Sequence, residues 1–154
     1  MERSPSLDRG SNEPVTLSLR FANSAPEVTL ARSAAHDLLL RNGVDDRARY
    51  AVELTLDELL DNVLRHGYEP GAAGSLTAEL TLAPQLITVE LSDDARPFDP
   101  TRHPEPPAPR SLAESSIGGR GLPLVRAATA SMRYRRVDER NHLTIEVARR
   151  HSSR

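Results

Sequence analysis

The sequence predicts an α/β two-layer sandwich, in which a mixed, mostly antiparallel five-stranded sheet carries helices on one face. Three observations lead to this prediction. Five short stretches alternate apolar and polar residues, two longer stretches have helical periodicity, and the strands come in hairpin pairs instead of β-α-β repeats. The chain has 154 residues, which is the size of one domain with a real core.

The elements are expected in the order β-α-α-β-β-α-β-β. Residues 1–13 are polar and lack periodicity, so we expect a disordered N-terminal tail there. The stretch 15–21 alternates apolar and polar residues and predicts a half-buried strand. Ser24 is a favoured N-cap and Gly43 a favoured C-terminal residue, so the first helix is expected between them.

The second helix is the longest predicted element, from a cap at Asp45 to Gly67. An apolar stripe over 48–63 forms its inner face. Glu58 and Asn62 are four residues apart, so their side chains share one face, at the rim of this stripe where a cleft would open. From spacing alone, this pair is either a solvated polar pair or a base beside a metal ligand.

Two predicted hairpins make up the rest of the sheet. Alternation over 76–82 and 87–91 indicates the first pair of strands, with a turn at 83–85. Strands around 131–137 and 143–147 form the second pair, with a turn at 138–141. The predicted domain therefore spans residues 14–149, and residues 150–154 form a C-terminal tail.

A proline-rich stretch over about 95–117 separates the two hairpins, and it holds six of the twelve prolines. A loop of this length inside one domain is typical of a functional lid or an insert. The glycine-rich run Gly118-Gly119-Arg120-Gly121-Leu122 follows and begins a short helix. Its backbone N–H groups are suited to phosphate oxygens.

Composition excludes several classes of function. The net charge of −2 gives no electrostatic case for nucleic acid or for an anionic membrane, and aromatic residues make up only 3% of the chain. The chain has no cysteine, so disulfides and thiol catalysis are excluded. No apolar run approaches the roughly 20 residues of a spanning helix. We expect a cytoplasmic protein.

Three motifs stand in a fixed order along the chain. They are Glu58…Asn62…His66-Gly67-Tyr68, then Asp93-Asp94-Ala95-Arg96-Pro97-Phe98-Asp99-Pro100, then Gly118-Gly119-Arg120-Gly121-Leu122. Together they resemble the GHKL (Bergerat-fold, histidine kinase-like) ATPases. More closely, the chain resembles the stand-alone anti-sigma-factor serine/threonine kinases of bacterial partner-switching systems. The resemblance covers about residues 15–148.

The resemblance implies that the cofactors are ATP and Mg²⁺. Asn62 is the implied magnesium ligand, and Glu58 is the implied general base for the attacking hydroxyl. Asp93 would accept a hydrogen bond from the adenine amino group, and Thr144 would reach the adenine through water. The other implied nucleotide-binding residues are Ala95, Gly118, Gly119, Gly121 and Leu122.

Ala95 is the main departure from the family pattern, which usually has glycine at this position. Glycine permits a positive φ and close approach to the base. One added methyl group in a tight site costs about 1–3 kcal/mol. Two outcomes are open here, weak nucleotide binding or an adjusted loop. Ala130 is a second departure, at a position where many relatives carry an acidic residue.

The implied function is an anti-sigma factor and protein kinase. It would phosphorylate a serine or threonine of a STAS-domain anti-anti-sigma partner, sequester a sigma factor or comparable regulator, and form a homodimer. One alternative is a binding module of the same fold that holds nucleotide weakly and switches by protein contact alone. A third possibility is an ATP-dependent co-activator that releases a phosphatase.

Overall fold

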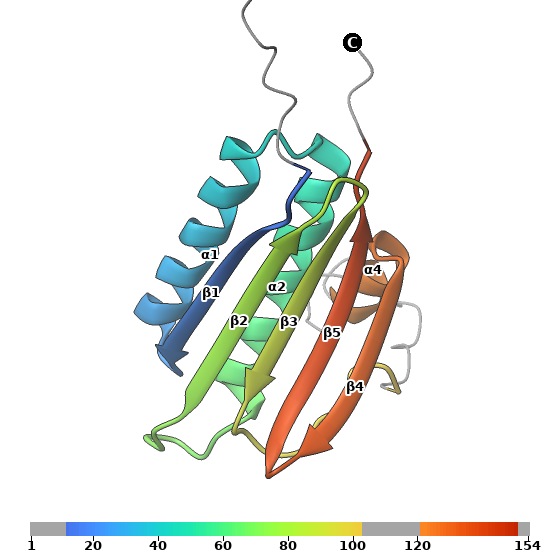
Figure 1. Cartoon of the computed structure of the whole chain (residues 1–154). Helices are drawn as coiled ribbons and strands as arrows, with labels where there is room; N and C mark the ends of the chain where they lie inside the picture. Colours follow the sequence, from blue (N-terminus) through green and yellow to red (C-terminus); the bar gives the residue numbers. More distant parts are fainter. Residues whose placement is uncertain (1–11, 103–120, 151–154) are drawn as a thin grey trace, which may run out of the picture.

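A computed structural model describes residues 12–102 and 121–150. Five strands form one sheet in the order β1-β2-β3-β5-β4, and each neighbouring pair is antiparallel. The three described helices all lie behind this sheet in Figure 1. The predicted two-layer sandwich and its order of elements are confirmed. The elements are β1 (Val15–Ala22), α1 (Ala25–Arg41), α2 (Asp46–His66), β2 (Ser75–Leu82), β3 (Leu86–Asp93), α4 (Gly121–Ala128), β4 (Ser131–Val137) and β5 (Arg140–Ala148).

Several predicted features fall outside the described residues. They are most of the N-terminal tail, the part of the proline-rich stretch from residue 103 onward, Gly118, Gly119, and the C-terminal tail beyond residue 150. Within the described ranges, no helix combines the length and the apolar character that crossing a membrane would require.

The two long helices begin at the predicted caps. The Ser24 hydroxyl accepts a hydrogen bond from the Glu27 N–H at 3.4 Å, and the Asp45 carboxylate accepts one from the Ala48 N–H at 3.0 Å. Each bond satisfies an N–H group that has no partner inside its helix. The second helix ends where Gly67 donates its N–H to the Val63 carbonyl at 2.9 Å.

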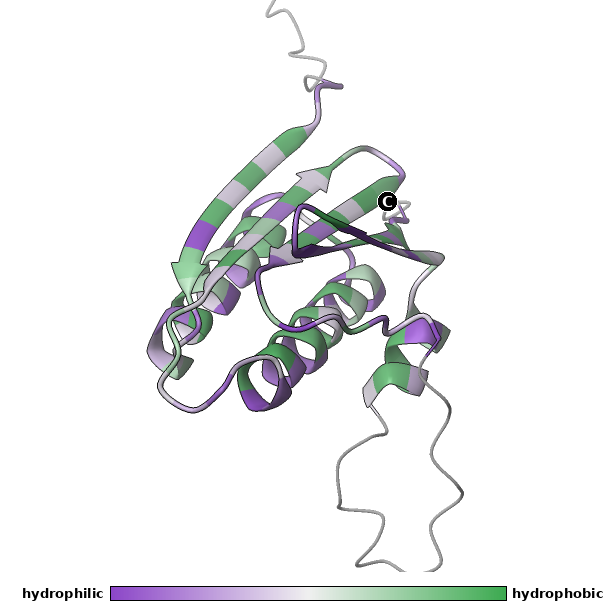
Figure 2. Cartoon of the chain, turned by 90° about the horizontal axis from the view of Figure 1, so that it is seen from below, coloured by the Kyte–Doolittle hydropathy of each residue, from purple (hydrophilic) through white to green (hydrophobic). Residues whose placement is uncertain are grey.

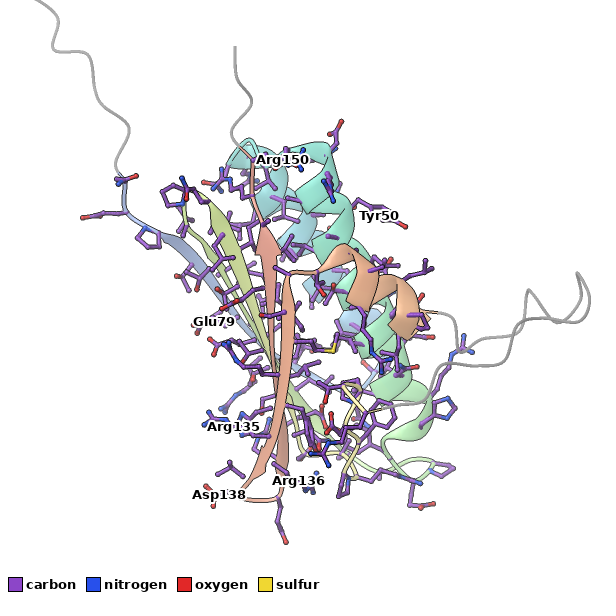
Figure 3. All side chains as sticks on the ribbon, turned by 90° about the vertical axis from the view of Figure 1, so that its right-hand side faces the viewer. Tyr50, Glu79, Arg135, Arg136, Asp138 and Arg150 are labelled. Atoms are coloured by element: carbon purple, nitrogen blue, oxygen red, sulfur yellow. The ribbon has the colours of Figure 1, made fainter. Side chains whose placement is uncertain are left out.

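The core lies between the helices and one face of the sheet. Apolar and polar side chains alternate along the strands, and green and pale bands show this alternation in Figure 2. The largest fully buried side chains come from both layers, and they include Val28, Leu39, Val52, Leu80, Ile87, Val89 and Ile145. The other face of the sheet is polar, and Figure 3 shows Glu79 and Arg135 on it, away from the helices.

A tight turn at Asp138 and Glu139 joins β4 to β5. Both residues have positive φ, at 51° and 61°, so the turn is shorter than the predicted 138–141. A two-residue turn of this kind fixes the register of a hairpin, and here Val137 pairs with Arg140. That register places Asn141 on the helix-facing side of the sheet.

Candidate active site

A cleft of about 530 Å³ lies between the helix layer and one end of the sheet. Its walls come from the C-terminal half of α2, the ends of β3 and β5, the loop after β3 and the first residues of α4. A cleft of this volume is large enough for a nucleotide-sized ligand. The lining includes six of the residues expected at the site: Glu58, Asn62, Asp93, Ala95, Gly121 and Leu122.

The two expected polar residues of α2 both face this cleft. Within residues 12–102 and 121–150, no hydrogen bond or ion pair joins the side chain of Glu58 or Asn62 to another residue. The Glu58 carboxylate instead lies against the start of α4. A methyl group built on Gly121 would be 1.8 Å from Glu58 Oε2, so any larger residue there would displace this carboxylate from its position.

Asp93 is the buried carboxylate of the cleft, with 8% of its surface exposed. It is the last residue of β3, and its Oδ1 accepts hydrogen bonds from the Ala95 N–H at 3.1 Å and from Asn141 Nδ2 at 2.8 Å. Burial raises the pKa of Asp93, because it penalises the charged form, although these two bonds oppose the shift. Since both donors meet Oδ1, Oδ2 is the oxygen that can receive a ligand's donor.

The wall around Asp93 is apolar. Leucine side chains from five elements line it: Leu60, Leu76, Leu91, Leu122 and Leu143. Apolar walls with a few placed polar groups are characteristic of small-molecule sites. A flat aromatic ring that carries one hydrogen-bond donor fits this combination of leucines and a carboxylate.

Ala95 sits in the loop after β3 without backbone strain. Among the described residues, the only positive φ values outside glycine are those of Asp138 and Glu139, so Ala95 adopts an ordinary backbone conformation. Its methyl group is buried and lies against Gly67, where an added methyl would come within 2.8 Å of the Ala95 Cβ. The loop is held there by Arg96, whose N–H donates to the Gly67 carbonyl at 3.0 Å.

Tyr68 and Asp94 join the loop after α2 to the end of β3. The Tyr68 hydroxyl donates to Asp94 Oδ1 at 2.7 Å, and the Ser75 N–H donates to the same oxygen at 2.9 Å. Burial and the bond to Asp94 raise the pKa of Tyr68, so its hydroxyl stays protonated. Partial burial opposes ionisation of Asp94, but the bonds from Ser75 and Tyr68 outweigh it and lower the pKa of Asp94.

Thr144 does not reach the cleft. Its neighbours Leu143 and Ile145 are buried on the helix-facing side, and successive side chains of a strand point to opposite faces. The Thr144 side chain therefore lies on the open face of the sheet, and the prediction for Thr144 is corrected. Gly118 and Gly119 lie outside the described residues.

Sequence reasoning missed Asn141, which donates to Asp93 from the neighbouring strand. A signal was present, because Asn141 shares the period-two alternation of Leu143, Ile145 and Val147. Extending that alternation two residues back from Leu143 places an amide on the core face of the sheet, directly opposite Asp93.

The described residues contain no group of three or more His, Cys, Asp or Glu side chains that could hold a metal ion by itself. Mg²⁺ commonly binds through one or two protein oxygens, with water and substrate phosphates as its other ligands. The amide oxygen of Asn62 in the cleft fits such a role, so a metal here would depend on a bound phosphate.

Comparison with known proteins agrees with this geometry. The family described as histidine kinase-like ATPase domain matches residues 21–147. A serine/threonine-protein kinase of Bordetella bronchiseptica, BtrW, is 31% identical over 130 residues, which are 84% of this chain and 92% of the relative. The crystal structure of the RsbU and RsbW domains of Rv1364c from Mycobacterium tuberculosis shares the fold, with a TM-score of 0.62 at 15% identity. That match covers 88% of this chain and 33% of the other.

Proposed function

The chain belongs to the histidine kinase-like ATPase family, and from this membership we propose that it is an ATP-dependent serine/threonine protein kinase acting on a STAS-domain anti-anti-sigma partner. The observation that supports this most directly is the cleft itself. It gathers Glu58, Asn62, Asp93 and Gly121 from three separate motifs around one volume of nucleotide size.

Each of these residues has a chemical role in the proposal. Asp93 accepts a hydrogen bond from the adenine amino group through Oδ2. Glu58 takes the proton of the partner's hydroxyl as its oxygen bonds to the γ-phosphorus, and the bond from that phosphorus to the β-phosphate oxygen breaks to leave ADP. Gly121, at the start of α4, leaves space for Glu58 and brings the helix N-terminus to the phosphates.

Asn62 is the residue that would hold Mg²⁺ together with the phosphates. The ion, when bound, would neutralise negative charge on the β- and γ-phosphates. Asn62 lies one helical turn from Glu58, so the proton acceptor and the metal ligand face the same end of the nucleotide.

The regulatory part of the proposal is the sequestration of a sigma factor or comparable regulator by a homodimer in the cytoplasm. It is supported by the similarity to the BtrW kinase and by the shared fold with a structure that contains an RsbW domain. An unphosphorylated STAS partner would then displace the bound regulator.

A second candidate is a binding module that holds nucleotide weakly. The feature that favours it is the Ala95 methyl group, which belongs to the cleft lining at a position where the family usually has glycine. The ordinary φ of Ala95 argues against it, because the loop accommodates the methyl group without backbone strain.

A thermal-shift titration with Mg-ATP separates the two candidates. A ligand at 100 times its dissociation constant stabilises a protein by about 2.7 kcal/mol, so a kinase should show a clear shift at millimolar ATP. We expect Asn62→Ala to lose the part of this shift that depends on Mg²⁺. No shift in the wild-type protein would favour the binding module.

Phosphorylation of the purified STAS partner then tests the chemistry. Glu58→Gln should keep the ATP-dependent shift and lose transfer of labelled phosphate. Glu53→Gln is the matched control, because Glu53 lies on the same helix, outside the cleft lining, and contacts His36 of α1. Full activity in Glu58→Gln would remove Glu58 from the proposed role.

A further inference from the structure

Asn141 is at the centre of a buried hydrogen-bond network beside Asp93. Only 7% of its surface is exposed. Its Nδ2 donates to Asp93 Oδ1 at 2.8 Å and to the Arg96 carbonyl at 2.9 Å, so both amide hydrogens have partners. Its Oδ1 accepts from the Tyr134 hydroxyl at 2.6 Å and from Arg136 Nη1 at 2.9 Å. All the hydrogen-bonding groups of this side chain are therefore engaged.

This network allows only one orientation of the Asn141 amide. Arg136 can only donate hydrogen bonds, so the amide oxygen must face it. The Arg96 carbonyl and the ionised Asp93 carboxylate can only accept, so the amide nitrogen must face them. A rotation of the amide by 180° would break the bonds to Arg136, the Arg96 carbonyl and Asp93, and only the Tyr134 hydroxyl could adapt by accepting instead of donating. The donor that meets Asp93 is thus fixed in place by partners from β4 and from the loop after β3.

The backbone fixes the position of Asn141 as firmly. Asn141 is the direct cross-strand neighbour of Asp93 in the β3–β5 pairing, so both side chains lie on the same face of the sheet. A slip of one residue in β5 would turn Asn141 to the open face. The two-residue turn at Asp138 and Glu139 prevents such a slip, and Figure 3 shows Asp138 at the tip of this hairpin.

We propose that Asn141 is a positioning residue for nucleotide selection, which orients the Asp93 carboxylate so that Oδ2 faces the base. This inference rests on the proposed function and deepens it. Asn141 and the Ala95 N–H together occupy Oδ1, and the carboxylate plane is then set by two donors from different segments. An adenine presents an amino group to Oδ2, whereas a guanine presents a carbonyl oxygen that the carboxylate repels.

The same side chain also connects the base-binding end of the cleft to the loop after β3. Its amide bonds the Arg96 carbonyl through Nδ2 and the Phe98 N–H through Oδ1, the latter at 3.4 Å. Phe98 lies in the cleft lining. A ligand that moves Asp93 would therefore also move this loop, because the Asn141 amide bonds to both.

The test measures the dissociation constants of Mg-ATP and Mg-GTP for the full chain by calorimetry. We expect the wild-type protein to prefer ATP. In Asn141→Ala, ATP affinity should fall about tenfold, as for loss of a hydrogen bond to a charged group, and GTP affinity should change less than about threefold. The measured ATP-to-GTP selectivity is the deciding quantity, because a purely structural defect lowers both affinities together.

Two controls accompany this variant. Tyr134→Phe removes one bond to the Asn141 oxygen and leaves the donor to Asp93 intact, so we expect selectivity to stay within about twofold of wild type. Thr144→Val lies on the same strand but on the open face, and it should change neither affinity. If Asn141→Ala does not fold, Asn141→Ser decides instead, since its hydroxyl keeps a polar group within the network.

Unchanged selectivity in a folded Asn141 variant would overturn the inference, whether both affinities fall equally or neither falls. Failure of the proposed function gives a different result. In that case the wild-type protein binds neither nucleotide, and the inference fails with it.

Discussion

The carboxylate of Glu58 lies directly against the α-carbon of Gly121, so the proposed proton acceptor on α2 and the first residue of α4 are complementary in shape. A methyl group on Gly121 would lie 1.8 Å from Glu58 Oε2 and 2.1 Å from its Cδ. The two residues are 63 positions apart in the sequence, and they meet because α4 packs across α2. This contact makes the placement of Glu58 sensitive to the residue at position 121.

Gly121→Ala should therefore reduce catalysis much more than stability. The Glu58 carboxylate is the end of a flexible side chain and can move away, so we expect the free energy of unfolding to change by less than about 1 kcal/mol. A general base displaced by an ångström costs about a hundredfold in rate. Phosphorylation rates check the predicted loss of catalysis, and urea unfolding of the same preparation checks the predicted small change in stability. In a Glu58→Ala background, adding Gly121→Ala should have no further effect on the rate, and an additional loss there would contradict the steric explanation.

A second close contact lies between Ala95 and Gly67. Because of it, replacing Ala95 by the family's glycine should lower the stability of the protein instead of improving ATP binding. Ala95→Gly removes a buried methyl group, worth about 0.8 kcal/mol, and adds chain entropy worth about 0.5–1 kcal/mol. We expect a loss of about 1–2 kcal/mol in unfolding free energy, with ATP affinity changed less than about threefold.

Ala130→Gly is the matched control for this variant, because Ala130 is exposed and lies outside any helix or strand. It should show only the entropic part of the loss. A gain of tenfold or more in ATP affinity for Ala95→Gly would instead mean that the methyl group obstructs the base, as the binding-module candidate requires.

The architecture was largely predictable because local signals and packing agree. The caps at Ser24 and Asp45 and the end at Gly67 all act within one turn of chain, and the structure has the two long helices at those positions. The strands could be located from the alternation of apolar and polar residues alone. The pairing of β2 with β3 and of β4 with β5 followed from short connections, which favour antiparallel neighbours, whereas the pairs β1–β2 and β3–β5 join segments far apart in the sequence.

The site was less predictable because its contacts join distant segments. Glu58, Asn62 and Asp93 were found through motifs, but Asn141 reaches Asp93 from 48 residues away, and nothing near Asp93 in the sequence signals a donor. Thr144 was assigned to the cleft by resemblance, although the alternation of β5 sends its side chain to the other face. Whether Ala95 would be strained depended on its φ, which the sequence does not specify.

Tyr68→Phe should destabilise the loop between α2 and β2. The variant loses the hydrogen bond to Asp94, and because Asp94 is exposed we expect a cost of about 1 kcal/mol or less. The pKa of Asp94 is lowered in the folded state, so the stability it contributes is present above its ordinary value of 3.8 and is lost as pH falls through the lowered value. The difference between wild type and variant should therefore shrink in acid.

Tyr50→Phe is the control for this measurement, since Tyr50 is a tyrosine of α2 with 59% of its surface exposed. Its unfolding free energy should match wild type at each pH. An equal loss in Tyr50→Phe and Tyr68→Phe would assign the effect to a general property of the tyrosine hydroxyl and not to the bond with Asp94.

ATP binding should depend on pH through the protonation of Asp93. Burial raises its pKa above the ordinary 3.8, with the neighbouring Asp94 adding to the shift and Asn141, the Ala95 N–H and Arg140 opposing it. A protonated Asp93 is a poor acceptor for an amino group, so ATP affinity should fall as pH decreases through the raised pKa. Calorimetry across the acid range tests this, and an affinity that stays constant down to pH 3.8 would contradict it.

The contribution of Asp93 to the free energy of unfolding should change with pH in the opposite direction to ATP affinity. Because the folded-state pKa is raised, the favourable contribution of the protonated group is fully present below 3.8 and is lost as pH rises through the raised value. Asp93→Asn, which does not titrate, should therefore gain stability relative to wild type as pH rises across this window, with a slope of at most about 1.4 kcal/mol per pH unit. Urea unfolding of both proteins measures the slope. A negative slope would mean that the hydrogen bonds from Asn141 and Ala95 outweigh burial and lower the pKa of Asp93.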